Sequence, residues 1–310
     1  MRPADVPLAD DLEKKLLSLI KQRPMLGVNS KKRLDTLILQ IIDSIRRIKY
    51  VAVIRDKTQG QIYTNPGSEY FDPLRAASWH NQQGNYDEAF WLVFLLTHFG
   101  KNKSSKWSLT RGVYAGLSNK VVWSWENICS DFQAFLKWLH KSQDELKALG
   151  SFGNHRKYQS LDAFKYSGTG SAIGSYISWV GPKHSHRQLV KRMQSKTDSP
   201  KALFKLFYDS MNNVMSFGRM AKFDYLTMIG KLHLAPIEPD SFYMEGATGP
   251  KTGAKLLFFG NKNVHVSTAE LNDLVKQLDS HLKLYFGMQV LEDSLCNWQK
   301  SPEKYVHFIG

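Results

Sequence analysis

Residues 245–260, EGATGPKTGAKLLFFG, have the composition of a loop that holds a phosphate where a helix begins. Glycine lets the backbone approach an anion, proline suits a first helical turn, and lysine adds charge. The candidate phosphate contacts are Gly249, Lys251 and Thr252. A nucleotide-binding P-loop is excluded, because the lysine precedes the second glycine instead of following it. An ordinary glycine-rich turn is the alternative.

Asp224 is the first candidate for a catalytic carboxylate. It shares the segment SFGRMAKFDYLTMIGKL with Arg219 and Lys222, among apolar neighbours. A carboxylate in such surroundings can have a raised pKa, or can be held charged by the basic side chains. A simple ion pair on an amphipathic helix is the alternative. Glu88, inside an apolar run, is the second candidate, and its alternative is a charge in the first turn of a helix.

Two basic segments have the composition of a DNA-backbone contact. The first, GNHRKYQSLDAF, contributes Asn154, His155, Arg156 and Lys157. The second, GPKHSHRQLVKRMQSKTDSPKALFK, contributes Arg187, Lys191 and Arg192. A solvated basic helix is the alternative for the second segment.

The charge balance points to a polyanionic partner. The chain of 310 residues has 42 basic and 28 acidic residues, a net charge of +14, and most often such an excess serves nucleic acid. A generally basic surface is the alternative. Two distant cysteines indicate a reducing compartment, and His184 and His186 lack a third ligand at a recognisable spacing, so we expect no metal site. With no secretory signal and no membrane-spanning run, the expected location is the cytoplasm, and the missing nucleotide fingerprints predict no cofactor.

The periodicity predicts a mainly α protein that positions these residues on helices. Apolar residues recur at helical spacing in six segments, near residues 34–48, 86–99, 130–150, 202–215, 219–232 and 267–286. Strand patterns are scarce, with VAVI and KVVWSW as the best candidates. A loop-rich break near residue 150 favours two interlocked helical lobes, residues 1–150 and 151–310.

The segment GPKTGAKLL resembles the hairpin of helix-hairpin-helix DNA-binding proteins, whose glycine-rich turn opens the second helix and holds a DNA phosphate. In the glycosylases of that family a catalytic aspartate follows the hairpin. Ser267 stands at the matching place and is suited to cap a helix, so this aspartate does not carry over. The resemblance matches Lys251 with the Schiff-base lysine of the bifunctional members.

Four blocks in order resemble a more specific family: FDPLRAASWHNQQGNYDEAFWLVFLLTHFGK, GSFGNHRKYQSL, SFGRMAKFDYLTMIGKL and PDSFYMEGATGPKTGAKLLFFG. Together they are similar to the α-glutamyl/putrescinyl thymine pyrophosphorylase group, clade 3, across about residues 65–262. The resemblance implies a distant helical relative of the helix-hairpin-helix glycosylases that acts on hypermodified bases of phage DNA. One branch resembles an anti-phage glycosylase that removes α-glucosyl-hydroxymethylcytosine.

The expected function is excision of such a base from double-stranded DNA in antiviral defence, by a cofactor-free monomer that does not act at a membrane. The base must leave the stack and enter a pocket. One alternative is a transferase that joins an amino acid or polyamine to a pyrophosphorylated base. The other is a helical DNA-binding module without catalysis.

Overall fold

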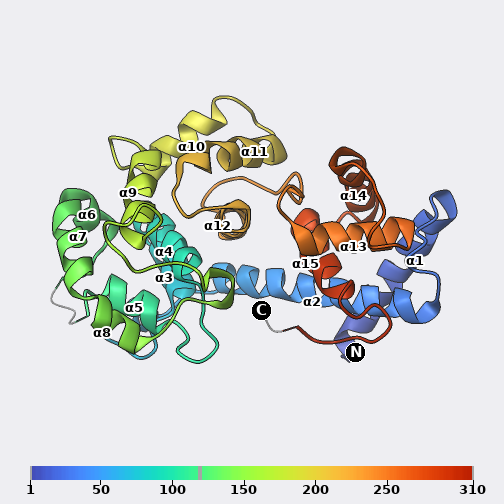
Figure 1. The fold of residues 1–310 in the computed structure, drawn as a ribbon, viewed down its shortest axis with the longest axis horizontal. Coiled ribbons are helices and arrows are strands. Elements are labelled where there is room, and N and C mark those ends of the chain that lie inside the picture. Colours follow the sequence, from blue (N-terminus) through green and yellow to red (C-terminus); the bar gives the residue numbers. More distant parts are fainter. Residues whose placement is uncertain (1, 118–120, 309–310) are drawn as a thin grey trace. The chain divides into compact units, whose positions relative to one another are not determined.

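The computed structural model describes residues 2–117 and 121–308, and every regular element within these ranges is helical (Figure 1). This confirms the mainly α fold. The α-helices of these ranges are α1 Val6–Gln22, α2 Lys31–Asp56, α3 Pro73–Gln82, α4 Tyr86–Phe99, α5 Ser108–Tyr114, α6 Trp125–Ser130, α7 Phe132–Lys141, α8 Gln143–Leu149, α9 Thr169–Val180, α10 His186–Gln194, α11 Pro200–Ser210, α12 Arg219–Lys231, α13 Thr248–Phe259, α14 Thr268–Leu282 and α15 Gly287–Trp298.

The helix caps follow the local sequence. Ser267 precedes α14, and its side chain accepts a hydrogen bond from the Glu270 amide at 3.1 Å, as the capping spacing predicts. Gly100 ends α4 with a positive φ of 67°, a conformation that costs glycine little. Both caps depend only on residues close in sequence, so the positions predicted from the sequence are also those in the structure.

Two segments differ from the sequence prediction. The helix predicted over residues 130–150 is two helices, α7 and α8, which meet at Ser142. The VAVI segment continues α2 instead of forming a strand. Its burial has the helical spacing, because Val51 and Ile54, three residues apart, are buried, whereas Val53 is exposed. In KVVWSW, Lys120 lies outside the described residues, and Ser124 caps α6.

The chain forms two compact units, residues 1–50 with 239–310 and residues 51–238. The division therefore runs at 50/51 and 238/239, where we expected 150/151. The physical reason is a shared core: apolar side chains of α1 and the first part of α2 pack with those of α13, α14 and α15. The chain ends are thus joined in one unit.

In the first unit, glycine permits a close helix–helix approach. A Cβ atom built at Gly253 of α13 would lie 2.3 Å from the carbonyl oxygen of Leu295 in α15. One built at Gly249 would lie 2.5 Å from the Cys296 sulfur. Both contacts are shorter than atoms allow, so these glycines set the distance between α13 and α15.

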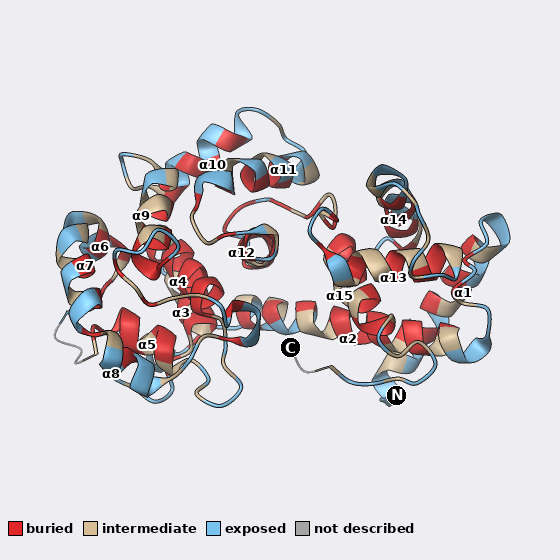
Figure 2. Cartoon of the chain, in the orientation of Figure 1, coloured by how far each residue is buried: buried red, intermediate tan, exposed pale blue. Residues whose placement is uncertain are grey.

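In the second unit, α4 forms the centre. Every residue of α4 from Glu88 to Phe99 is buried (Figure 2). Helices α3, α10 and α12 pack against it. A helix that is apolar on all sides must be surrounded by protein, which explains this arrangement. No helix among the described residues is both long and apolar enough to cross a membrane.

Gly253→Ala tests the α13–α15 contact. We expect a loss of about 1–3 kcal/mol in unfolding free energy, because the added methyl meets backbone atoms that cannot rotate away. Urea denaturation measures this loss. The control is Gly60→Ala, whose Cβ would have its nearest neighbour at 3.7 Å and should leave stability unchanged or slightly raised. Equal stability of the two variants would contradict the close approach.

Candidate active site

Both carboxylate oxygens of Glu88, in α4, have hydrogen-bond partners inside the protein. Its two carboxylate oxygens accept hydrogen bonds from the Tyr114 hydroxyl at 2.7 Å and the Trp125 amide at 2.8 Å. Burial raises the pKa of Glu88, and these two hydrogen bonds partly offset the rise. With both oxygens paired inside the protein, Glu88 is placed to connect α4 to α5 and α6.

A buried chain of hydrogen bonds starts one residue earlier, at Asp87. The Asp87 carboxylate accepts from His186 Nδ1 at 2.9 Å, and His186 Nε2 lies 2.6 Å from the Tyr176 hydroxyl. The Tyr176 hydroxyl lies 2.8 Å from that of Tyr225 in α12.

The ionisation of these groups determines which atom donates and which accepts in each of these hydrogen bonds. Burial lowers the pKa of His186 more than Asp87 raises it, so the imidazole is neutral. Since Nδ1 donates to Asp87, Nε2 accepts from Tyr176, which leaves the Tyr176 oxygen to accept from Tyr225. Sequence reasoning singled out His186 only as half of a metal-ligand pair and missed this chain, because its members come from four different helices.

Asp224 lies next to Tyr225 on α12 and differs from Glu88 in having no partner. Among the described residues, no side chain or backbone group donates a hydrogen bond to its carboxylate or pairs with it. The side chain is half-buried. Burial raises the pKa of Asp224, and the charges of Arg156, His155, Lys231 and Arg219 oppose this rise without cancelling it. The Asp224 carboxylate, predicted as catalytic from the sequence, is therefore half-buried, unpaired and surrounded by basic side chains.

Arg156 is the buried cation of this group. Its Nε donates to the Thr97 carbonyl at 3.0 Å, and its guanidinium lies 5.7 Å from the centre of the Phe217 ring. Nη2 is buried and has no hydrogen-bond partner among the described residues. Burial lowers the pKa of Arg156, and the Asp224 charge raises it. A buried guanidinium with an open donor is suited to receive an oxygen or nitrogen acceptor from a ligand.

The loop that carries Arg156 is fixed against the end of α4. The Gly153 amide donates to the Phe99 carbonyl at 2.7 Å, and a Cβ atom at Gly153 would lie 2.8 Å from the backbone of Gly100. The predicted contacts Asn154, His155 and Lys157 are exposed on this loop. The structure thus brings His155 and Arg156 close enough for their charges to act on Asp224.

Two predicted neighbours of Asp224 on α12 have different surroundings. The Arg219 guanidinium lies 5.3 Å from the centre of the Phe223 ring, and its charge acts on Asp224. Lys222 is directed elsewhere: its ammonium donates to Asn212 at 2.6 Å and lies 3.9 Å from the centre of the Tyr208 ring. Residues two apart on a helix do not share a face, which explains the difference.

The basic helix α10 has its predicted contacts Arg187, Lys191 and Arg192 on the exposed side. His186 lies on its buried side, in the hydrogen-bond chain. Within residues 2–117 and 121–308, no group of three His, Cys, Asp or Glu side chains is arranged to hold a metal ion. The exposed cations of α10 remain available for an anionic partner.

In the other unit, the glycine-rich segment opens α13. Gly246 has the positive φ, 77°, whereas Gly249 lies inside the helix. A cavity of about 290 Å³ lies at this end, lined among others by Lys251, Thr252 and Lys255, and Lys251 donates to the Thr268 hydroxyl at 3.0 Å. No side chain caps the first turn of α13. The preceding helix α12 ends at residue 231 in the other unit, so the two-helix part of the predicted motif is not established.

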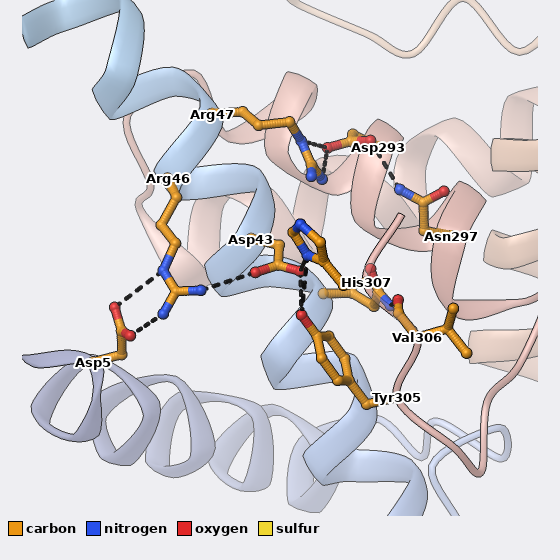
Figure 3. Close-up of polar contacts among 10 residues, drawn as sticks. Asp5, Asp43, Arg46, Arg47, Asp293, Asn297, Tyr305, Val306 and His307 are labelled. Atoms are coloured by element: carbon orange, nitrogen blue, oxygen red, sulfur yellow. Dashed lines mark hydrogen bonds and ion pairs between the residues drawn. The ribbon is translucent and has the colours of Figure 1, made fainter. Parts of the chain in front are cut away.

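The same unit contains a polar network that the sequence did not reveal (Figure 3). Asp43 of α2 is buried and accepts from Arg46 at 3.0 Å, from His307 at 2.9 Å and from the Tyr305 hydroxyl. Burial alone would raise the pKa of Asp43, but hydrogen bonds from Tyr305 and His307 hold it below its ordinary value. Asp43 thereby anchors the C-terminal segment to α2. Two of its three partners, Tyr305 and His307, lie more than 260 positions away in sequence, which explains why no local pattern shows the network.

The buried His98 of α4 predicts a stability that depends on pH. Its Nε2 lies 3.0 Å from the Thr169 hydroxyl, and burial lowers the pKa of His98 from 6.5 to about 3. Between these values the unfolded chain binds a proton that the folded chain does not, so the unfolding free energy falls as pH falls. In urea denaturation from pH 7 to 4, His98→Gln should show a shallower fall than the wild type. The exposed control His140→Gln should follow the wild type, and parallel curves for all three proteins would rule out the buried neutral histidine.

Comparison with protein families gives a match that covers most of this chain. The family model described as α-glutamyl/putrescinyl thymine pyrophosphorylase clade 3 matches residues 32–310, a longer range than the resembling blocks in the sequence. Comparisons with curated proteins and with solved structures found no match. The family is one of DNA hypermodification, which suggests an enzyme acting on modified DNA bases. The chain belongs to the α-glutamyl/putrescinyl thymine pyrophosphorylase family, clade 3.

Proposed function

We propose that this protein is a DNA glycosylase that removes a hypermodified base, of the glucosylated hydroxymethylcytosine type, from invading phage DNA. The observation that carries the proposal is the state of Asp224: half-buried, unpaired and set among basic side chains. Perturbed carboxylates of this kind concentrate at catalytic sites. The family, one of DNA hypermodification, supports a modified DNA base as the substrate.

The proposed reaction is hydrolysis of the bond between C1′ of the sugar and the base nitrogen. Positive charge develops on the sugar as this bond breaks, as in other glycoside hydrolyses. Asp224 takes a proton from water, the water oxygen bonds to C1′, and the base leaves with the bonding electrons and is protonated. A raised pKa brings the carboxylate nearer to the working pH, where general-base catalysis is most effective.

Arg156 has a separate role in this proposal. Its open Nη2 donor stabilises negative charge on the departing base or on a flanking phosphate. His155 and Lys157 on the same loop contact the DNA backbone. The hydrogen bond between Tyr176 of α9 and Tyr225, which follows Asp224 in the sequence, holds α12 in place.

The glycine-rich end of α13 is proposed as a second contact with the DNA backbone. Uncapped amides at a helix start attract phosphate, and Lys251 and Lys255 add positive charge at the cavity there. The exposed cations of α10 extend the basic surface of the other unit. Both surfaces support binding of double-stranded DNA by the chain.

A transferase is the second candidate, and the family name supports it. A pyrophosphorylase clade can handle a base activated with pyrophosphate, and the same cations would neutralise that group. In this case an amine of an amino acid or polyamine would displace pyrophosphate, and the C1′–N bond would stay intact. Release of free base from DNA distinguishes excision from this reaction.

Asp224→Asn is expected to abolish base release while DNA binding stays within about threefold of the wild type, because the amide keeps the shape but cannot take a proton. The acid side of the wild-type pH–rate profile should have its midpoint above the ordinary aspartate pKa of about 3.9. Abasic sites in glucosylated phage DNA give the rate. Glu88→Gln is the control: it should lower stability yet keep turnover per folded molecule. Retained turnover in Asp224→Asn would remove this residue from the mechanism.

Lys251→Gln combined with Lys255→Gln tests the phosphate contact at α13. Loss of two phosphate contacts should weaken DNA binding and reduce the slope of log affinity against log salt by about 1.8. Fluorescence anisotropy at several salt concentrations measures both. Lys14→Gln combined with Lys276→Gln removes the same charge from exposed positions and should change neither strongly.

The same double variant also tests covalent chemistry at Lys251. A phosphate contact predicts that turnover at saturating DNA is retained, whereas a Schiff-base lysine predicts its loss.

Equal effects of the two double variants on DNA binding would show that α13 makes no specific contact.

A further inference from the structure

A second polar cavity, in residues 51–238, has no role in the reaction proposed for Asp224. Its volume is about 640 Å³, within the usual range of small-molecule sites. It is lined by the end of the α2–α3 connection, the start of α3, the segment after α4 and the start of α5. Neither Asp224 nor Arg156 lines it.

Four cations line this cavity without a counter-ion. Arg75, Lys101, Lys106 and Arg111 form no ion pair with any carboxylate of the described residues. Of the two acids that line it, Asp72 uses an oxygen to accept from the Leu74 and Arg75 amides at the start of α3. The four cations outnumber the two lining acids, Glu69 and Asp72, so the cavity has an excess of positive charge that an outside anion can balance.

Neutral groups hold these cations in place. The Arg111 guanidinium donates to the Ser68 carbonyl at 3.2 Å, and Lys106 donates to the Lys103 carbonyl at 2.7 Å. The Arg75 guanidinium lies 4.6 Å from the centre of the Tyr63 ring. Such contacts orient a guanidinium or ammonium and leave its charge unneutralised, which is the condition for binding phosphate.

Aromatic surface lies beside the cations. Tyr70 is 58% exposed, and Lys101 lies 5.7 Å from the centre of the Trp107 ring. The indole nitrogen of Trp107 is buried and has no acceptor among the described residues. Cations next to exposed rings are the combination that binds nucleotides, since phosphate meets the charges and the base stacks on a ring. Glu69, exposed at the cavity, can accept a hydrogen bond from an exocyclic amine or a sugar hydroxyl.

We propose that this cavity binds one nucleotide unit, with its phosphate on Lys101, Lys106, Arg75 and Arg111 and its base on the surface of Tyr70 and Trp107. The unit can be a free nucleotide or part of a DNA strand, because both present the same phosphate and ring. The proposal does not depend on the reaction proposed for Asp224.

The test is binding of thymidine 5′-monophosphate to the full chain by calorimetry, with thymidine and inorganic phosphate as partial ligands. The monophosphate should bind at least tenfold more tightly than either part. Arg111→Gln and the exposed Lys101→Gln should each weaken its binding at least fivefold, and thermal melting confirms that both variants fold. Lys103→Gln, an exposed neighbour that does not line the cavity, is the matched control and should bind normally.

Three results would overturn the nucleotide site: no binding of the monophosphate, equal binding of inorganic phosphate, or binding that Lys101→Gln and Arg111→Gln do not change. A single-stranded oligonucleotide identifies the source, since tighter binding with the same variant dependence assigns the cavity to a DNA strand. Asp224 does not line this cavity, so failure of the glycosylase proposal leaves this result unaffected.

Discussion

The burial of α4 from Glu88 to Phe99 is the constraint on which the second unit depends. A helix without a solvent-facing side must have neighbours all around it, and each polar group on its buried part needs a partner inside the protein. Glu88 obtains two donors and His98 obtains the Thr169 hydroxyl, while Asp87 in the first turn starts the chain that reaches Tyr225. The buried helix therefore determines where polar groups of five surrounding helices lie: side chains of α5, α9, α10 and α12 and a backbone amide of α6.

The same packing positions α12 and the loop after α8. The Phe217 ring stacks on Phe94 of α4, with 4.8 Å between ring centres. The Arg156 guanidinium lies over the same Phe217 ring. A buried donor without a partner costs on the order of 1–3 kcal/mol, and more when it is charged. The open Arg156 donor carries such a cost, and the half-buried Asp224 carboxylate nearby also has no partner. Binding of a substrate that pairs with them would offset it, which is the physical basis of the proposed site.

Local chemistry made part of this structure predictable from the sequence. Apolar periodicity identified α2, α4, α12 and α14, the Ser267 cap lies where its spacing placed it, and the family follows from four sequence blocks. Contacts between distant segments were not predictable. The joining of both chain ends in one unit, the Asp43 network and the tyrosine–histidine chain all depend on residues brought together only by folding. Lys222 shows the same limit, because its direction on α12 depends on Asn212 and Tyr208 rather than on its own neighbours in sequence.

The most direct test of the central claim is release of free base by the wild-type protein. The full chain is incubated without added cofactor with glucosylated phage DNA and with unmodified DNA, and mass spectrometry identifies the released base while abasic sites are counted. The account predicts free modified base and abasic sites from the glucosylated DNA alone. An intact C1′–N bond in every hypermodified DNA, together with an amine-dependent mass gain on pyrophosphorylated bases, would contradict it and assign the chain to base decoration.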